Sequence, residues 1–162
     1  MRAIRLMQGL ILICLSLFGS VLHATPDDDV LAVIVAPGFD TAVSSEELTL
    51  IYKRKKLFWP DDSKVQPVNL PSSDPLRYRF SQAVLGAAPE DMEKYWNDMY
   101  FHGVSPPYVL ASQEAVIRFV VSTPGAIGYV PYCSVRDRAR IVLVITAEGR
   151  VGDKRASVRC DR

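Results

Sequence analysis

Apolar and polar positions alternate in blocks along the chain, and these blocks predict strands and helices. The continuous apolar run from Val30 to Ala36 is typical of a strand that is buried on both faces. A capping box from Ser44 to Glu47 predicts the start of a short helix. Further strands are expected over residues 65–69, 123–130 and 140–146.

Three more helices are predicted between the second and third strands. The first follows Asp74 and Pro75, which supply a cap and a proline at the first helical position, and Gly86 closes it. The second covers residues 90–99 and the third covers residues 113–121. The apolar side chains of the second helix share one face and predict a stripe that packs on the core: Met92, Tyr95, Trp96 and Met99. The order of elements predicts the α/β class, with helices packed on a mixed sheet.

The first 24 residues have the three-part layout of a secretory signal. Arg2 and Arg5 precede an apolar stretch over residues 10–18, and Ala24 is a small residue suited to cleavage. This pattern predicts an exported domain over residues 25–162 without membrane insertion after cleavage, and an uncleaved anchor is the alternative. The whole chain has 19 Lys and Arg against 18 Asp and Glu, so loss of the two leader arginines leaves 17 against 18 and a net charge near −1. Attraction to nucleic acid is not indicated.

Two cysteines follow the leader, Cys133 and Cys160. An oxidising export compartment permits them to form a disulfide, and two free thiols are the alternative. Their spacing fits no metal-binding pattern.

Neither catalysis nor a cofactor is predicted from the residue types present. His102 is the one histidine after the leader, and its place beside Gly103 at a helix end is typical of a capping or surface residue. The chain contains no Gly-x-Ser-x-Gly elbow and no phosphate-cradling glycine loop. One histidine and two dispersed cysteines also do not make a metal site.

A small oxyanion is the ligand that the central segment favours. Ser72 and Ser73 offer hydroxyl donors just before a helix start, where free backbone N–H groups and the peptide dipoles favour an anion. Arg77 and Arg79 could add charge-assisted hydrogen bonds. These four residues form the candidate ligand-binding set.

A second hypothesis starts from four consecutive cations, Lys53 to Lys56. They complement the negative end of the preceding helix or form a basic patch for an acidic partner. In the second case the neighbouring Phe58 and Trp59 would complete a contact surface for an envelope protein partner.

Four segments in order carry a resemblance to a known family: Leu48 to Trp59, Pro67 to Phe80, Tyr95-Trp96 with Phe101 to Gly103, and Thr123 to Tyr129. Together they resemble the phosphate-binding proteins of bacterial ABC transporters, and most of all the short stand-alone members of the type 2 periplasmic binding protein superfamily.

The resemblance implies a single lobe of that fold, a periplasmic location, no enzymatic activity and phosphate or a related oxyanion as ligand. Ser72 and Ser73 occupy the position of the family's Ser-Gly-Thr turn, whose glycine and threonine have no counterpart here. A link to phosphate transport is the expected function, and an envelope accessory domain that has lost the ligand is the alternative.

Overall fold

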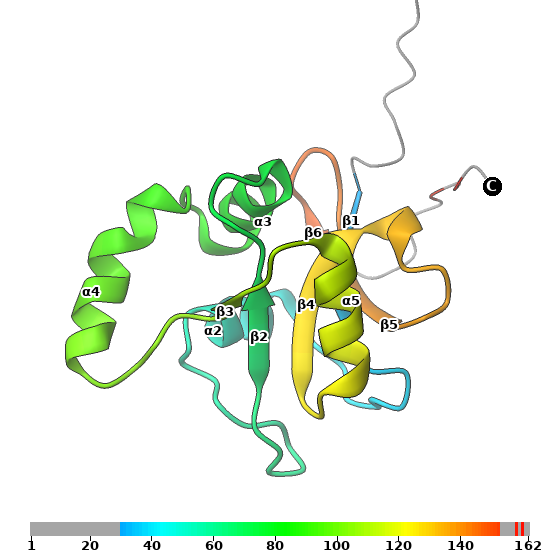
Figure 1. Cartoon of the computed structure of the whole chain (residues 1–162), viewed down its shortest axis with the longest axis horizontal. Helices are drawn as coiled ribbons and strands as arrows, with labels where there is room; N and C mark the ends of the chain where they lie inside the picture. The colour runs from blue at the N-terminus through cyan, green and yellow to red at the C-terminus, as the bar shows by residue number, and fades with distance from the viewer. Residues whose placement is uncertain (1–29, 153–157, 159, 161–162) are drawn as a thin grey trace, which may run out of the picture.

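The computed structural model describes residues 30–152, Val158 and Cys160. The predicted signal peptide over residues 1–24 therefore lies outside the described residues. In chain order, the elements are β1 (Leu31–Val35), α2 (Ser45–Tyr52), β2 (Gln66–Asn69), α3 (Pro75–Leu85), the 3-10 helix η2 (Glu90–Met92), α4 (Glu93–Phe101), β3 (Tyr108–Val109), α5 (Gln113–Ser122), β4 (Ala126–Pro131), the 3-10 helix η3 (Tyr132–Ser134), β5 (Arg140–Ile145) and β6 (Val151–Gly152). Figure 1 labels the α-helices and the strands.

The strands form one mixed sheet in the order β3-β2-β4-β1-β5-β6. Strand β2 runs parallel to β3 and β4, whereas β1 runs antiparallel to β4 and β5, and β5 and β6 form a hairpin. The prediction of an α/β fold with helices on a mixed sheet is confirmed. Strands β3 and β6 were not predicted as strands, because each has only two residues and exists through its pairing with a neighbour.

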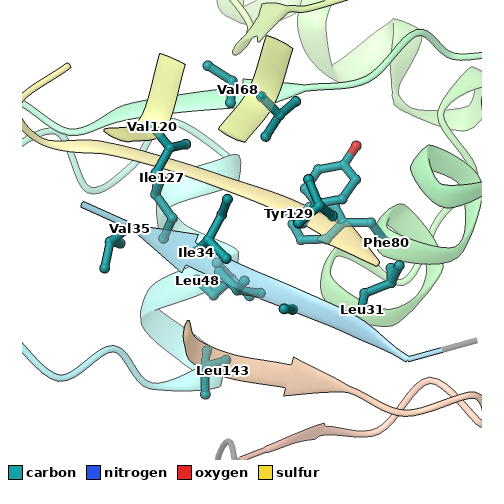
Figure 2. Packing of buried hydrophobic residues seen from close by; sticks show 14 of the residues in the cluster. Leu31, Ile34, Val35, Leu48, Val68, Phe80, Val120, Ile127, Tyr129 and Leu143 are labelled. Atoms are coloured by element: carbon teal, nitrogen blue, oxygen red, sulfur yellow. The ribbon is translucent and has the colours of Figure 1, made fainter. Parts of the chain in front are cut away.

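Neighbouring residues of β4 show that helices cover both faces of the sheet. A Cβ atom on Gly128 would lie 2.6 Å from Val116 Cγ1 and 3.1 Å from Val120 Cγ2, so α5 packs directly on this face. The next residue, Tyr129, points to the opposite face and stacks on Phe80 of α3 at 3.8 Å between ring centroids (Figure 2). Burial from both sides explains why every residue of β1 and β4 is buried.

The turn before β4 is hydrogen-bonded to the long segment between α2 and β2. Gly125 has a φ of +74°, and a Cβ atom there would lie 2.2 Å from the Lys64 carbonyl oxygen. The Gly125 carbonyl accepts hydrogen bonds from the Trp59 indole at 3.0 Å and from the Gln66 N–H at 2.9 Å. Only glycine combines this backbone conformation with so close an approach.

The predicted core-facing stripe of the 90–99 helix is only partly confirmed. Met92 is buried, but it lies in η2, and Tyr95, Trp96 and Met99 of α4 are half-buried. No residue of α4 is buried, because this helix stands to one side of the sheet and does not pack across it (Figure 1). Its tie to the body of the protein includes a hydrogen bond of 2.7 Å from the Tyr95 hydroxyl to the Lys53 carbonyl.

A disulfide joins Cys133, in η3, to Cys160, 27 residues further along the chain. Within the described residues, no helix is long and apolar enough to cross a membrane.

Candidate functional site

The candidate site lies where β2 ends and α3 begins. As predicted, Asp74 caps α3, Pro75 is its first residue and Gly86 ends it in a left-handed conformation. Strand β2 is parallel to both of its neighbours, β3 and β4. The carboxyl ends of parallel strands are a common place for ligands in α/β proteins, because the loops that leave them converge there.

The start of α3 has fewer free donors than the sequence hypothesis requires. The Asp74 carboxylate accepts a hydrogen bond of 2.8 Å from the Leu76 N–H, and Pro75 has no N–H to give. Ser72 and Ser73 are both exposed in the preceding turn. An anion at this helix start therefore has to be held mainly by side chains.

Arg77 is the side chain with the unsatisfied bonding capacity at this site. Only 8% of its surface is exposed, and its Nη1 is buried without a hydrogen-bond partner in the described structure. It occupies the third position of α3, from which a side chain reaches back toward the capping residue. A buried polar group without a hydrogen bond costs about 1–3 kcal/mol, and more when the group is charged, so the unpartnered Nη1 of Arg77 is an unusual feature of this fold.

A buried hydrogen-bond network is centred on the Tyr129 hydroxyl, on which the charge and the hydrogen bonding of Arg77 also act. The Tyr129 hydroxyl accepts from the Leu70 N–H at 3.3 Å and donates to Asn69 Oδ1 at 3.3 Å. Burial raises the pKa of the Tyr129 hydroxyl, and the nearby Arg77 charge opposes that rise. Burial likewise holds the pKa of Tyr52 well above its usual value, again against the Arg77 charge. The Arg77 charge therefore acts on two buried hydroxyl groups, those of Tyr129 and Tyr52.

Ser81 lies one helical turn after Arg77 and is fully buried. Its hydroxyl oxygen also has no hydrogen-bond partner in the part of the chain that the structure describes. The side of α3 that faces the sheet thus carries two unsatisfied polar groups, Arg77 Nη1 and Ser81 Oγ.

Arg79 lies on a different side of α3 from Arg77. It lines a cavity of about 350 Å³ between the outer side of α3 and the turn of the β5–β6 hairpin, together with Tyr78, Gln82 and Glu148. Of the four candidate ligand-binding residues, Ser72 and Ser73 are exposed in the turn before α3, Arg77 is buried in its first turn, and Arg79 lines this cavity.

Two of the four cations after α2 are engaged within the protein, Lys56 and Arg54. Lys56 pairs with Glu47, and this hydrogen bond is the main reason that the pKa of the Glu47 carboxyl is lowered. Arg54 Nη1 donates to the Val65 carbonyl at 3.2 Å. Trp59 is buried, with its indole bonded to Gly125, so the prediction that it belongs to an exposed contact surface is wrong. Phe58 remains more than half exposed.

No metal centre or histidine-based catalytic group is found among the described residues. Histidine, cysteine, aspartate and glutamate side chains there form no group of three that could hold a metal ion. His102 is an exposed capping residue of α4 and lies with Nδ1 2.7 Å from the Asp98 carbonyl.

Asn69 and Tyr129 were not among the predicted site residues. A signal for Asn69 was present, because it is a polar residue at the carboxyl end of a strand. Tyr129 belongs to the Thr123 to Tyr129 motif, but its contact with Leu70 depends on how β4 is placed beside β2.

Solved structures of phosphate receptors share this fold. An ABC-type phosphate transport receptor from Vibrio cholerae matches at 24% identity with a TM-score of 0.56, over 69% of this chain and 44% of that one. A phosphate ABC transporter substrate-binding protein with bound phosphate from Clostridium perfringens matches at 18% identity with a TM-score of 0.57, over 69% and 43%. PstS from Borrelia burgdorferi matches at 19% identity with a TM-score of 0.52, over 67% and 42%.

These matches define the class of fold. The described structure corresponds to part of the phosphate-receptor fold, as a single lobe of it would, and it spans less than half of the length of each receptor. The sequence matches no protein-family model and no curated protein. At identities below 25%, the likeness is one of fold.

Proposed function

We propose that this protein is a non-enzymatic, exported binding module for a small oxyanion, with phosphate as the leading ligand. Ser72, Ser73 and Arg77 at the start of α3 are the proposed contacts. The predicted signal peptide and the fold shared with phosphate transport receptors support a periplasmic role linked to phosphate uptake.

The observation that carries this proposal is the unpartnered Nη1 of the buried Arg77. A guanidinium binds phosphate through a planar fork of N–H donors, and such charge-assisted bonds are about twice as strong as neutral ones. An oxyanion at Arg77 would supply the partner that Nη1 lacks among the described residues. The exposed hydroxyls of Ser72 and Ser73 lie on the solvent side, where an entering ligand would meet them first.

Binding is expected to be weak, with a Kd on the order of 1 mM, or about −4 kcal/mol. The Asp74 carboxylate lies in the same turn and repels an anion, and its bond to the Leu76 N–H removes one donor. Tight capture of a small ligand also requires walls on several sides, and the match to the receptors covers less than half of each of them.

Isothermal titration of the purified chain with phosphate and with sulfate tests this proposal. Arg77→Met removes the guanidinium but keeps an apolar stem, and we expect it to abolish the heat of binding. Arg79→Met is the matched control, because it makes the same change on another side of the same helix. Ser72→Ala combined with Ser73→Ala should weaken binding. A folded Arg77→Met variant with the wild-type affinity would exclude this site.

An envelope accessory domain is the second candidate function. It is favoured by Phe58, whose large apolar side chain remains exposed beside the basic run. If the wild-type chain gives no heat with either anion, and its melting temperature is unchanged in millimolar phosphate, this second function is preferred. A ligand that binds only the folded state must raise its stability.

A further inference from the structure

The segment from η2 to β3, residues 90–109, is called the arm here. Its helix α4 stands to one side of the sheet, and β3 at its end lies beside β2 (Figure 1). The arm carries large apolar side chains that are mostly exposed: Tyr100 at 70%, Phe101 at 85%, Tyr108 at 67% and Val109 at 63%. Isolated exposed apolar residues are normal on protein surfaces. Several on one segment are typical of a surface that another molecule covers.

The arm ends in an edge of the sheet. Strand β3 is the outermost strand on its side and pairs with β2 alone, with Tyr108 opposite Val68 and Val109 opposite Asn69. Both side chains of β3 are exposed, so neither face of this strand is covered by the described residues. An exposed sheet edge offers backbone groups to a second chain.

The charges of the arm point to the chemistry of its partner. The arm has one lysine, Lys94, and four exposed acidic residues: Glu90, Asp91, Glu93 and Asp98. None of these five charged residues forms an ion pair with another described residue. A partner that covers the arm should therefore present cations.

The chain itself carries the matching cations beside the arm. Lys53 and Lys55 follow α2, and the Tyr95 hydroxyl of α4 is bonded to the Lys53 carbonyl at 2.7 Å. Each molecule therefore presents an acidic segment, made of η2 and α4, and a basic segment that follows α2 next to it. Such a surface is complementary to itself, because a two-fold axis brings the acidic segment of each copy to the basic segment of the other.

We propose that the arm is the contact surface of a homodimer. The acidic residues of α4 meet Lys53 and Lys55 of the second copy, and Phe101, Tyr108 and Val109 are buried between the two chains. Aromatic residues are enriched at the centre of such interfaces.

The dimer would also change the surroundings of the candidate oxyanion site. In the β2–β3 register, Val109 lies opposite Asn69. The Asn69 side chain accepts a hydrogen bond from the Tyr129 hydroxyl, which interacts with Arg77. A second copy on the β3 edge would thus stand close to the site and could add a wall to it. This consequence rests on the proposed function, whereas the dimer itself does not.

Sedimentation equilibrium of the purified chain without phosphate tests the dimer. We expect a reversible monomer–dimer equilibrium that weakens as salt is raised, because charge pairs contribute to it. Phe101→Ser combined with Tyr108→Ser should weaken the dimer by at least about tenfold. Tyr78→Ser is the control, because Tyr78 is also about half exposed but lies on α3, outside the arm. Circular dichroism checks that each variant is folded.

A charge exchange identifies which surfaces meet. Asp98→Lys should weaken the dimer, and adding Lys55→Asp to it should restore the association, since the charges are then exchanged between the two surfaces. A wild-type chain that stays monomeric at a protein concentration of about 100 μM would overturn the proposal. A dimer that is unaffected by the arm variants would also overturn it. Phosphate binding is measured separately, so the proposed function can fail while the dimer stands.

Discussion

The central sheet and the arm use their apolar residues in opposite ways. Every residue of β1 and β4 is buried, and helices pack on both faces of these strands. In the arm, α4 has no buried residue, although it contains two tyrosines, a tryptophan and a phenylalanine. The sheet therefore supplies the stability of the fold, and the apolar groups of the arm remain available for contact with another molecule.

Truncation of one phenylalanine in each region tests this comparison with the largest expected effect. Phe80 is fully buried and stacked on Tyr129, so Phe80→Ala should lower the free energy of unfolding by about 3–5 kcal/mol. Phe101→Ala in the arm should change it by no more than about 0.5 kcal/mol. Urea denaturation at a protein concentration low enough to keep the chain monomeric measures both. Similar losses for the two variants would show that the arm is part of the core.

Two glycines with the same backbone conformation provide a second test. Gly125 and Gly103 have φ of +74° and +75°, so alanine is strained at both positions. A new Cβ atom would also meet the Lys64 carbonyl at 2.2 Å in the first case, and nothing within 4 Å in the second. We expect Gly125→Ala to cost about 3 kcal/mol and Gly103→Ala about 1 kcal/mol. Equal costs would mean that the close contact at Gly125 relaxes without loss.

The buried tyrosines predict a dependence of stability on alkaline pH. Burial raises the pKa of Tyr52 and of Tyr129 in the folded state, so both stay protonated while the unfolded chain ionises near pH 10. Their contribution is complete below that pH and is lost as the pH rises further, by up to about 1.4 kcal/mol per pH unit for each tyrosine. Tyr52→Phe removes one of the two tyrosines, so it should halve the loss of unfolding free energy per pH unit that the two cause together. A slope that does not change in the variant would exclude Tyr52 as its source.

Local signals in the sequence were sufficient for the elements that organise the sheet. The apolar run before Pro37 predicts β1, and Asp74, Pro75 and Gly86 predict both ends of α3. Strand β3 could not be predicted in this way, because a pair of residues after two prolines has no periodicity. Its pairing with β2 is a property of the folded chain.

The candidate site was predicted only in part, and for a similar reason. Arg77 was identified from its place after the helix start, but its interaction with Tyr129, more than 50 residues away in the sequence, depends on the folded chain. The sequence also led us to group Arg79 with Arg77, although two residues along a helix turn a side chain by about 200°. The exposure of α4 was missed because its pattern of apolar residues is the same whether a helix packs on its own core or on another molecule.

The signals of the arginine side chains in a nitrogen-15 NMR spectrum test the central claim most directly. The resonance of Arg77 can be assigned with Arg77→Met, and Arg79→Met provides the matched reference. Addition of phosphate should shift the Arg77 resonance along a saturable curve, with a Kd on the order of 1 mM and a smaller effect on Arg79. An Arg77 resonance that does not move while phosphate is raised to about 100 times that Kd would contradict the proposal that this buried guanidinium holds the oxyanion.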